Sequence, residues 1–262
     1  MTIESSMILK NILGKTIYLC GDSHEENGSD IQGVEALLKV IKDILKNNGN
    51  AFVEMGEYQL QRVMESADKG LANGMYYRIP CLLKNLQLEG QDGICINDIR
   101  QDSKSAPLIS WANCSGLKQT TTIVKWQDIE DRFTHAKERI VSLTNNPKLQ
   151  QITQTLFEPI ERRWSKIKVT VNNLDYNLDS NLLPAVVDHE ALQWKDENLE
   201  LLLLYEVGLL CDMEAWIRGT SDSCIIYCGW QHVDNLLGPF QELGFTRWAA
   251  PPSPSMISIV DP

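Results

Sequence analysis

Short apolar runs alternate with amphipathic stretches along this chain, and that alternation predicts strands and helices in turn. The runs at 17–20, 51–56, 93–100 and 223–229 have the length and composition of buried strands. Between the first two runs, apolar positions recur at helical spacing over 30–46. A strand, a helix and a second strand in this order predict parallel strands that are neighbours or near neighbours.

Helical spacing continues through the rest of the chain and is strongest at 196–219, where Gly219 can end the helix. Further helices are predicted at 58–69, 76–86, 126–143, 148–167 and 230–240. A last pair of strands, 245–250 and 255–260, is separated by prolines, which cannot serve a central ladder. The chain therefore predicts an α/β fold with a mainly parallel central sheet flanked by helices.

The pattern changes in the middle of the chain, from residue 102 to about residue 194. Ser, Asn, Thr and Gln become more frequent there, and apolar periodicity weakens between 103 and 122. The helices predicted at 126–143 and 148–167 lie inside this region. We therefore expect a single α/β domain over 1–262, with a mostly helical insertion or cap at about 103–194.

Length and charge limit the class of protein. The chain has 262 residues, 43% of them hydrophobic, which is enough to bury a sizeable core. It carries 24 basic and 35 acidic residues, a net charge of −11, and has no dense run of Lys or Arg. Because this charge disfavours attraction to phosphate backbones, nucleic acid is not an expected partner.

Targeting signals and cysteines indicate the compartment. The amino terminus lacks the basic and apolar regions of a secretory signal. The longest apolar run, 199–210, is interrupted by Glu200 and Glu206, so no membrane span is expected. Seven cysteines without close Cys-x-x-Cys pairs fit reduced thiols, and Cys224 and Cys228 fit small buried hydrophobic residues. A cytoplasmic location is expected, with delivery into another cell as an alternative.

Ionisable residues follow three of the predicted strands at their carboxyl ends. Asp22 and His24 follow the first run, and Glu54 lies near the end of the second. Asp98 and Arg100 end the third. Carboxyl ends of parallel strands meet at one edge of the sheet, where ligands bind in open α/β folds. The structural alternatives are a polar turn after the first strand, and ion pairs Asp98–Arg100 and Asp212–Arg218 that only lock the sheet edge.

The spacing Gly-x-x-His occurs twice, at 21–24 and at 229–232, each time directly after an apolar strand. Glycine lets the backbone turn tightly, while the histidine three residues on faces the space above the strand ends. If the two strands are close, His24 and His232 meet across one cavity. His135 is a weaker candidate, because it lies in a charged helix where a solvated side chain is expected.

Two imidazoles and several carboxylates permit two kinds of water activation. They can hold a divalent metal with an open position for water. They can also position a water molecule directly, with a histidine as general base. Arg100 or Arg218 could then stabilise a developing oxyanion or anchor an anionic group of the substrate.

These motifs resemble those of the Tiki/TraB superfamily, which includes erythromycin-esterase-like and ChaN-like proteins. In that family a first strand ends in Gly-Glu-x-His, a second ends in Glu and a late strand ends in Gly-x-x-His. Residues 21–24, Glu54 and 229–232 look like these three elements. Asp22 stands where the family generally has Glu, and it keeps the charge on a side chain shorter by a methylene.

The resemblance covers the two ends of the chain, about 1–100 and 205–250, and leaves the middle unmatched. The family's Asp-x-Arg after a third strand is similar to 98–100. Its arginine in the helix before the last strand is similar to Arg218, with Asp212 one and a half turns earlier.

Members of that superfamily include metal-dependent peptidases, esterases that open a lactone with an activated water, and haem-binding proteins. The resemblance therefore implies a hydrolase acting on an ester or amide of a small molecule or peptide. His24, Glu54 and His232 are expected to act on water or to bind a divalent metal (Mn, Co or Zn). Asp22 and Arg218 are expected to assist catalysis. Substrate contacts are expected from Asp98, Arg100 and Asp212.

Two other functions stay open. One is a binding protein that holds haem or another small ligand without catalysis, with Tyr18, Tyr58 and Tyr227 as candidate contributors. The other is a degenerate scaffold of the same fold that binds a protein partner through the helical insertion.

Overall fold

The chain forms two compact units in the computed structural model, which describes residues 3–22, 31–56, 60–61, 63–65, 75–99, 126–173 and 199–248. One unit comprises Met1–Asn97 and Asp212–Pro262, and we call it the sheet unit. The other comprises Asp98–Cys211, and we call it the helical unit. That they form a single domain stays a prediction.

The described residues of the sheet unit form a six-stranded sheet in the order β4-β3-β5-β2-β1-β6. The strands are β1 (Ile3–Lys10), β2 (Thr16–Asp22), β3 (Asn50–Glu54), β4 (Ile94–Asn97), β5 (Ser223–Gly229) and β6 (Thr246–Arg247). β2, β5, β3 and β4 are parallel neighbours, whereas β1 runs antiparallel to both β2 and β6. The predicted α/β fold with a mainly parallel sheet is confirmed.

A tight turn explains why β1, which the sequence pattern did not predict, pairs with β2. Asn11 Oδ1 accepts the backbone N–H groups of Leu13 at 3.1 Å and Lys15 at 2.9 Å. Gly14 has φ +85°, a conformation that costs little only for glycine. The resulting hairpin places β1 and β6 at one edge of the sheet and leaves β3 and β4 at the other.

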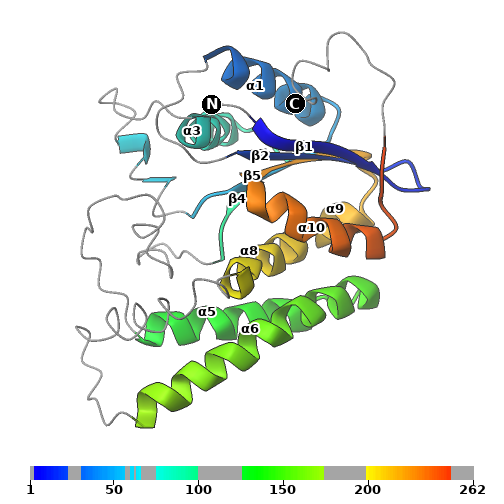
Figure 1. The fold of residues 1–262 in the computed structure, drawn as a ribbon. Helices are drawn as coiled ribbons and strands as arrows, with labels where there is room; N and C mark the ends of the chain where they lie inside the picture. The colour runs from blue at the N-terminus through cyan, green and yellow to red at the C-terminus, as the bar shows by residue number, and fades with distance from the viewer. Residues whose placement is uncertain are drawn as a thin grey trace. The chain divides into compact units, whose positions relative to one another are not determined.

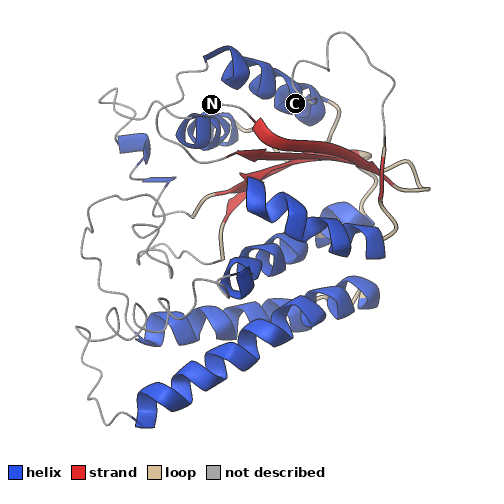
Figure 2. Ribbon diagram, in the orientation of Figure 1, coloured by secondary structure: helices blue, strands red, loops and turns tan. Residues whose placement is uncertain are grey.

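Helices cover the two faces of the sheet (Figure 1). α1 (Ile31–Lys46) and α3 (Met75–Leu88) pack on one face. α9 (Glu214–Arg218) and α10 (Trp230–Glu242) lie on the other. Figure 2 shows the strands in red between these blue helices. We call the two sides of the sheet the α1/α3 face and the α10 face.

Side-chain alternation along the strands decides which residues point to which face. The hydrophobic core against α1 and α3 includes the strand residues Cys20, Ala51, Val53, Ile94, Ile225 and Tyr227. Glu54 directly follows Val53, so it points to the α10 face. Asp22 comes two positions after Cys20, so it points to the α1/α3 face.

A buried lysine fastens α9 to the hairpin. Lys15 is 8% exposed, and its Nζ donates to the carbonyl oxygens of Trp216 at 2.9 Å, Gly219 at 2.9 Å and Ser221 at 2.8 Å. The helix thereby gains a cation at its carboxyl end, where the helix dipole favours positive charge. Burial lowers the pKa of Lys15, and the neighbouring carboxylate of Asp222 opposes this effect.

The described part of the helical unit consists of α5 (Trp126–Ser142), α6 (Pro147–Asn173) and α8 (Leu199–Asp212) up to Cys211. Phe133 of α5 and Phe157 of α6 have ring centroids 6.0 Å apart. The predicted insertion at about 103–194 is therefore mostly helical wherever the structure describes it.

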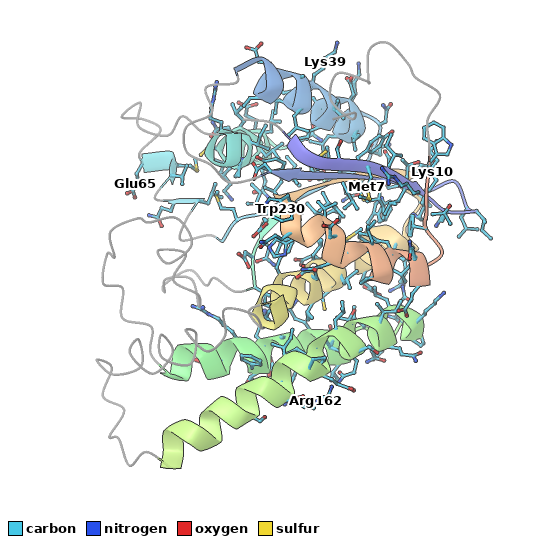
Figure 3. The ribbon with its side chains drawn as sticks, in the orientation of Figure 1. Met7, Lys10, Lys39, Glu65, Arg162 and Trp230 are labelled. Carbon is cyan, nitrogen blue, oxygen red and sulfur yellow. The ribbon has the colours of Figure 1, made fainter. Side chains whose placement is uncertain are left out.

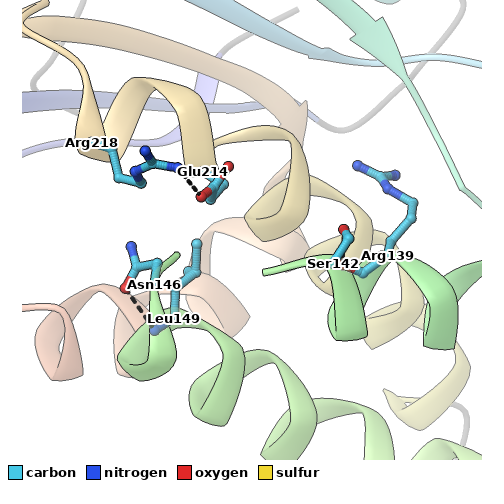
Figure 4. A network of polar contacts seen from close by, with 6 residues as sticks. All are labelled: Arg139, Ser142, Asn146, Leu149, Glu214 and Arg218. Carbon is cyan, nitrogen blue, oxygen red and sulfur yellow. Dashed lines mark hydrogen bonds and ion pairs between the residues drawn. The ribbon is translucent and has the colours of Figure 1, made fainter. Parts of the chain in front are cut away.

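Polar side chains mark the end of α5 and the start of α6 (Figure 4). Ser142 Oγ donates to the carbonyl oxygen of Arg139 at 2.7 Å. Asn146 Oδ1 accepts the backbone N–H of Leu149 at 3.1 Å, which is an N-cap contact. Pro147, directly after the cap, fits the first helical position because that position needs no N–H donor.

Some predicted elements differ in extent from the structure. The helix predicted at 196–219 is divided into α8 and α9 at Met213. The helix predicted at 148–167 continues to Asn173. The strand predicted at 255–260 lies outside the described residues. Among the helices that are described, none has the length and apolar character needed to cross a membrane.

Candidate functional site

Glu54 and His232 form a buried pair on the α10 face of the sheet. Glu54 is the last residue of β3 and His232 is the third residue of α10, which begins directly after β5. His232 Nε2 lies 3.2 Å from Glu54 Oε1, and the two side chains are 2% and 1% exposed. Because β3 and β5 are parallel neighbours, their carboxyl ends bring the two residues together.

The second carboxylate oxygen of Glu54 is held by the backbone at the start of α10. Gly229 is the N-cap residue of this helix and has no side chain with which to cap it. Its N–H donates to Glu54 Oε2 at 2.7 Å. The acid on the neighbouring strand thus binds at the positive end of the helix dipole, where negative charge is stabilised.

Asp22 makes its described contact on the α1/α3 face. It is the last residue of β2 and is fully buried. The hydroxyl of Tyr227 in β5, itself 1% exposed, donates a hydrogen bond to Asp22 Oδ2. The alternation of β2 and β3 therefore directs Asp22 to the face opposite Glu54 and His232.

Asn97 and Asp212 form a second pair on the α10 face. Asn97 ends β4, and its Cα is the register partner of Glu54 in β3. Its side chain follows Ile96, which packs against the α1/α3 core, so it points to the same face as Glu54. Asn97 Nδ2 donates to Asp212 Oδ2 at 2.9 Å. Both residues are partly exposed.

Asn97 was not among the residues predicted from the sequence. It reads as the polar end of an apolar run, which needs no functional explanation. The signal that could have found it is its position opposite Glu54 in a parallel pair of strands. Asp212 was predicted as a substrate contact, and the structure places it beside Asn97.

Arg218 lies on α9, where it pairs with Glu214 one turn earlier. Arg218 Nη1 is 2.9 Å from Glu214 Oε1, and the arginine side chain is 49% exposed (Figure 4). This is an ordinary helical i,i+4 pair, which stabilises a helix only slightly. Arg218 therefore makes its described contact within α9.

The remaining predicted residues divide into described and undescribed. Asp98 follows β4 directly and is 1% exposed. His24 and Arg100 lie outside the described residues. His135 is exposed on α5, as its charged surroundings predict.

Trp230, the first residue of α10, is 39% exposed (Figure 3). It lies between Gly229, which donates to Glu54, and His232, two positions on. An aromatic side chain that solvent reaches thus lies two positions before His232 at the start of α10.

The atoms of Glu54 and His232 suit a metal centre as well as a direct hydrogen bond. Imidazole nitrogen and carboxylate oxygen are ordinary ligands of zinc and related divalent ions. Two atoms bound to one tetrahedral ion lie about 3.4 Å apart. The Nε2 to Oε1 distance of 3.2 Å is close to that value. Within the described ranges, no group of three or more His, Cys, Asp or Glu side chains is arranged to hold a metal ion.

Burial on β2 and β5 keeps the thiols of Cys20 and Cys224 protonated at neutral pH. Burial raises the pKa of Cys20 to about 12 and strongly raises the pKa of Cys224. The thiolate, which is the reactive form, is therefore scarce at both positions. Cys224 and Cys228 are fully buried, which confirms that they pack as small hydrophobic residues.

Comparisons of the chain with models of known families, with curated proteins and with solved structures found no match.

Proposed function

We propose that this protein is a hydrolase that activates water at Glu54 and His232 and cleaves an ester or amide of a small molecule or peptide. The observation that carries the proposal is the 3.2 Å contact between His232 Nε2 and Glu54 Oε1, with both side chains almost fully buried. The resemblance of 21–24, Glu54 and 229–232 to the Tiki/TraB pattern supports the same reaction class.

Burial argues for chemistry at this pair rather than for stability alone. Removing two ionisable groups from water is costly, and well-packed apolar residues of similar volume often stabilise a fold as well or better. Glu54 and His232 nevertheless lie at the carboxyl ends of neighbouring parallel strands, the usual place for ligands in such sheets. Ionisable groups held in this way are candidates for proton transfer.

In the proposed reaction, the oxygen of water attacks the carbonyl carbon while the Glu54–His232 pair takes the proton. Gly229 fixes the carboxylate through Oε2, so Oε1 stays directed at the imidazole. The pair then returns the proton to the departing nitrogen or oxygen, and the products are an acid and an amine or alcohol. A bound divalent metal (Mn, Co or Zn) would polarise the water and the carbonyl.

The other predicted residues take different parts in the proposal. His24, three residues after Gly21, is proposed as the opposing base or metal ligand, and Arg100 as the group that stabilises the oxyanion. Asp22 points to the face opposite Glu54 and His232, so we propose a structural role for it in its hydrogen bond with Tyr227. We propose a structural role also for Arg218 in its pair with Glu214.

The proposal includes a cytoplasmic location, which the free cysteines of the described residues support. A protein partner bound through the helical unit is compatible with the same reaction. None of the described contacts favours the haem-binding alternative.

The test combines metal analysis with turnover of the purified protein on a panel of esters and peptides. His24→Ala and His232→Ala are compared with His135→Ala, the matched control on an exposed helix surface. We expect the first two variants to lose activity and the control to keep it. Unchanged turnover in both His24→Ala and His232→Ala would refute the proposal. A haemin titration tests the haem-binding alternative, because a haem-binding protein gives a histidine- or tyrosine-ligated spectrum and a hydrolase need not.

A further inference from the structure

Four polar residues form a row across the α10 face at the carboxyl ends of β4, β3 and β5. In order they are Asp212, Asn97, Glu54 and His232, joined by the Asn97–Asp212 and Glu54–His232 contacts and by the Glu54–Asn97 register. The row is buried at Glu54 and His232 and partly exposed at Asn97 and Asp212. Of these four residues, solvent reaches Asn97 and Asp212 more readily.

The contact with Asp212 fixes which end of the Asn97 amide faces outward. A carboxylate accepts hydrogen bonds and donates none, so the amide nitrogen Nδ2 must be the atom that faces Asp212. The amide oxygen Oδ1, an acceptor, is thereby turned away from Asp212. Among the described residues, the side chain of Asn97 makes no other hydrogen bond.

The strand spacing that separates Asn97 from Glu54 is about 1 Å larger than the repeat of a peptide, a difference that the side chain of Asn97 can span. Adjacent strands lie about 4.8 Å apart. Successive peptide groups of a chain are about 3.8 Å apart. A carbonyl placed at the Glu54–His232 pair therefore has a neighbouring peptide group within reach of Asn97 Oδ1.

From this placement we infer that Asn97, oriented by Asp212, positions the substrate, and that the substrate is a peptide. Asn97 Oδ1 accepts the N–H of a peptide group next to the bond that is cut. This inference rests on the proposed hydrolase function and names its substrate class. A site built to bond an N–H discriminates against an analogue that lacks the donor.

The experiment uses a peptide that the wild-type protein hydrolyses and two analogues. Each analogue carries an ester oxygen in place of the N–H of one flanking peptide group, while the cleaved bond is unchanged. Because one hydrogen bond is lost, we expect kcat/KM of one analogue to be about tenfold lower than that of the parent peptide. Asn97→Leu should abolish this difference, by lowering kcat/KM for the parent and leaving the analogue within about twofold.

A pair of exchanged residues tests the role of Asp212. Asp212→Leu should lower kcat/KM for the parent peptide more than for the analogue, because the amide of Asn97 is no longer oriented. The double variant Asn97→Asp with Asp212→Asn reverses the direction of the hydrogen bond and returns an acceptor to position 97. We expect it to restore the preference for the parent peptide over the analogue. If Asp212 had a purely structural role, its variants would change kcat/KM for both substrates in parallel.

The outcomes separate this inference from the proposed function. If Asn97→Leu keeps its fold by circular dichroism and lowers kcat/KM equally for both substrates, the inference is overturned and the proposed hydrolase function stands. If the wild-type protein cleaves esters but no peptide, the inference is also overturned. If it cleaves neither, the proposed function itself fails.

Discussion

The carboxylate of Glu54 accepts the backbone N–H of Gly229 at 2.7 Å, so the end of β3 is fastened to the start of α10. The same carboxylate faces the imidazole of His232 through its other oxygen. One acid therefore holds a helix terminus and takes part in the candidate site. Experiments on Glu54 must separate these two roles, and the amide isostere glutamine makes this possible.

Glu54→Ala is expected to destabilise the fold by about 3 kcal/mol, because it leaves a buried N–H and a buried imidazole without their acceptor. Glu54→Gln retains an oxygen that can accept the N–H of Gly229, and it should cost about 1 kcal/mol. Urea unfolding of each variant gives the free energy of unfolding, from which both losses are obtained. Equal losses for the two variants would contradict the capping role of Glu54.

Tyr227→Phe removes the hydroxyl that donates to the buried carboxylate of Asp22. We expect a loss of about 1–3 kcal/mol of stability, because the acceptor stays buried without this donor. Turnover per folded molecule should change less than threefold, since this pair lies on the α1/α3 face. Urea unfolding and steady-state kinetics on the same preparation check both expectations. A loss of activity with unchanged stability would instead place Asp22 in the reaction.

Lys15→Met is expected to destabilise the protein by about 2–4 kcal/mol, because three carbonyl groups near the end of α9 lose a charged donor. Lys10→Met is the matched control, since Lys10 Nζ lies 3.4 Å above the partly exposed ring of Trp248. Its loss should cost about 0.5–1 kcal/mol. The comparison uses the midpoints of urea unfolding of the two variants. Similar midpoints would show that Lys15 does not stabilise the carboxyl end of α9.

We expect the buried thiol of Cys20 to make the fold less stable at alkaline pH. Burial raises its pKa from 9.0 to about 12 in the fold, so between these values the unfolded chain binds fewer protons than the native one. Stability is therefore fully present below pH 9.0 and falls as the pH rises toward 12. The advantage of wild type over Cys20→Ala should shrink by about 1.4 kcal/mol per pH unit in this window. A constant advantage from pH 8 to pH 10 would contradict the raised pKa.

The sequence pattern predicts the parallel part of the sheet well, for a local reason. The run at 223–229 is bounded by a polar segment and by a glycine, and β5 occupies the same residues. The sequence does not predict β1, because Ile3–Lys10 mixes polar and apolar residues. This segment is a strand because it pairs with β2 and β6.

The sequence predicts only those parts of the candidate site that follow from motifs local to one stretch of the chain. The Gly-x-x-His spacing at 229–232 and the acid at the end of β3 correctly indicate that His232 and Glu54 come together. Asp22 ends a neighbouring parallel strand, yet alternation turns its side chain to the other face. The side chain of Asn97 is oriented by Asp212, which is distant in sequence, so no local pattern predicts its role.

The most direct test of the central claim compares the same substitution at a buried and at an exposed glutamate. Glu54→Gln changes the carboxylate that faces His232, and Glu158→Gln changes an exposed one on α6. On a substrate that the wild-type protein cleaves, we expect kcat/KM of Glu54→Gln to fall by about 10²–10⁴ and that of Glu158→Gln to stay within about twofold. A folded Glu54→Gln protein with wild-type turnover would contradict the account.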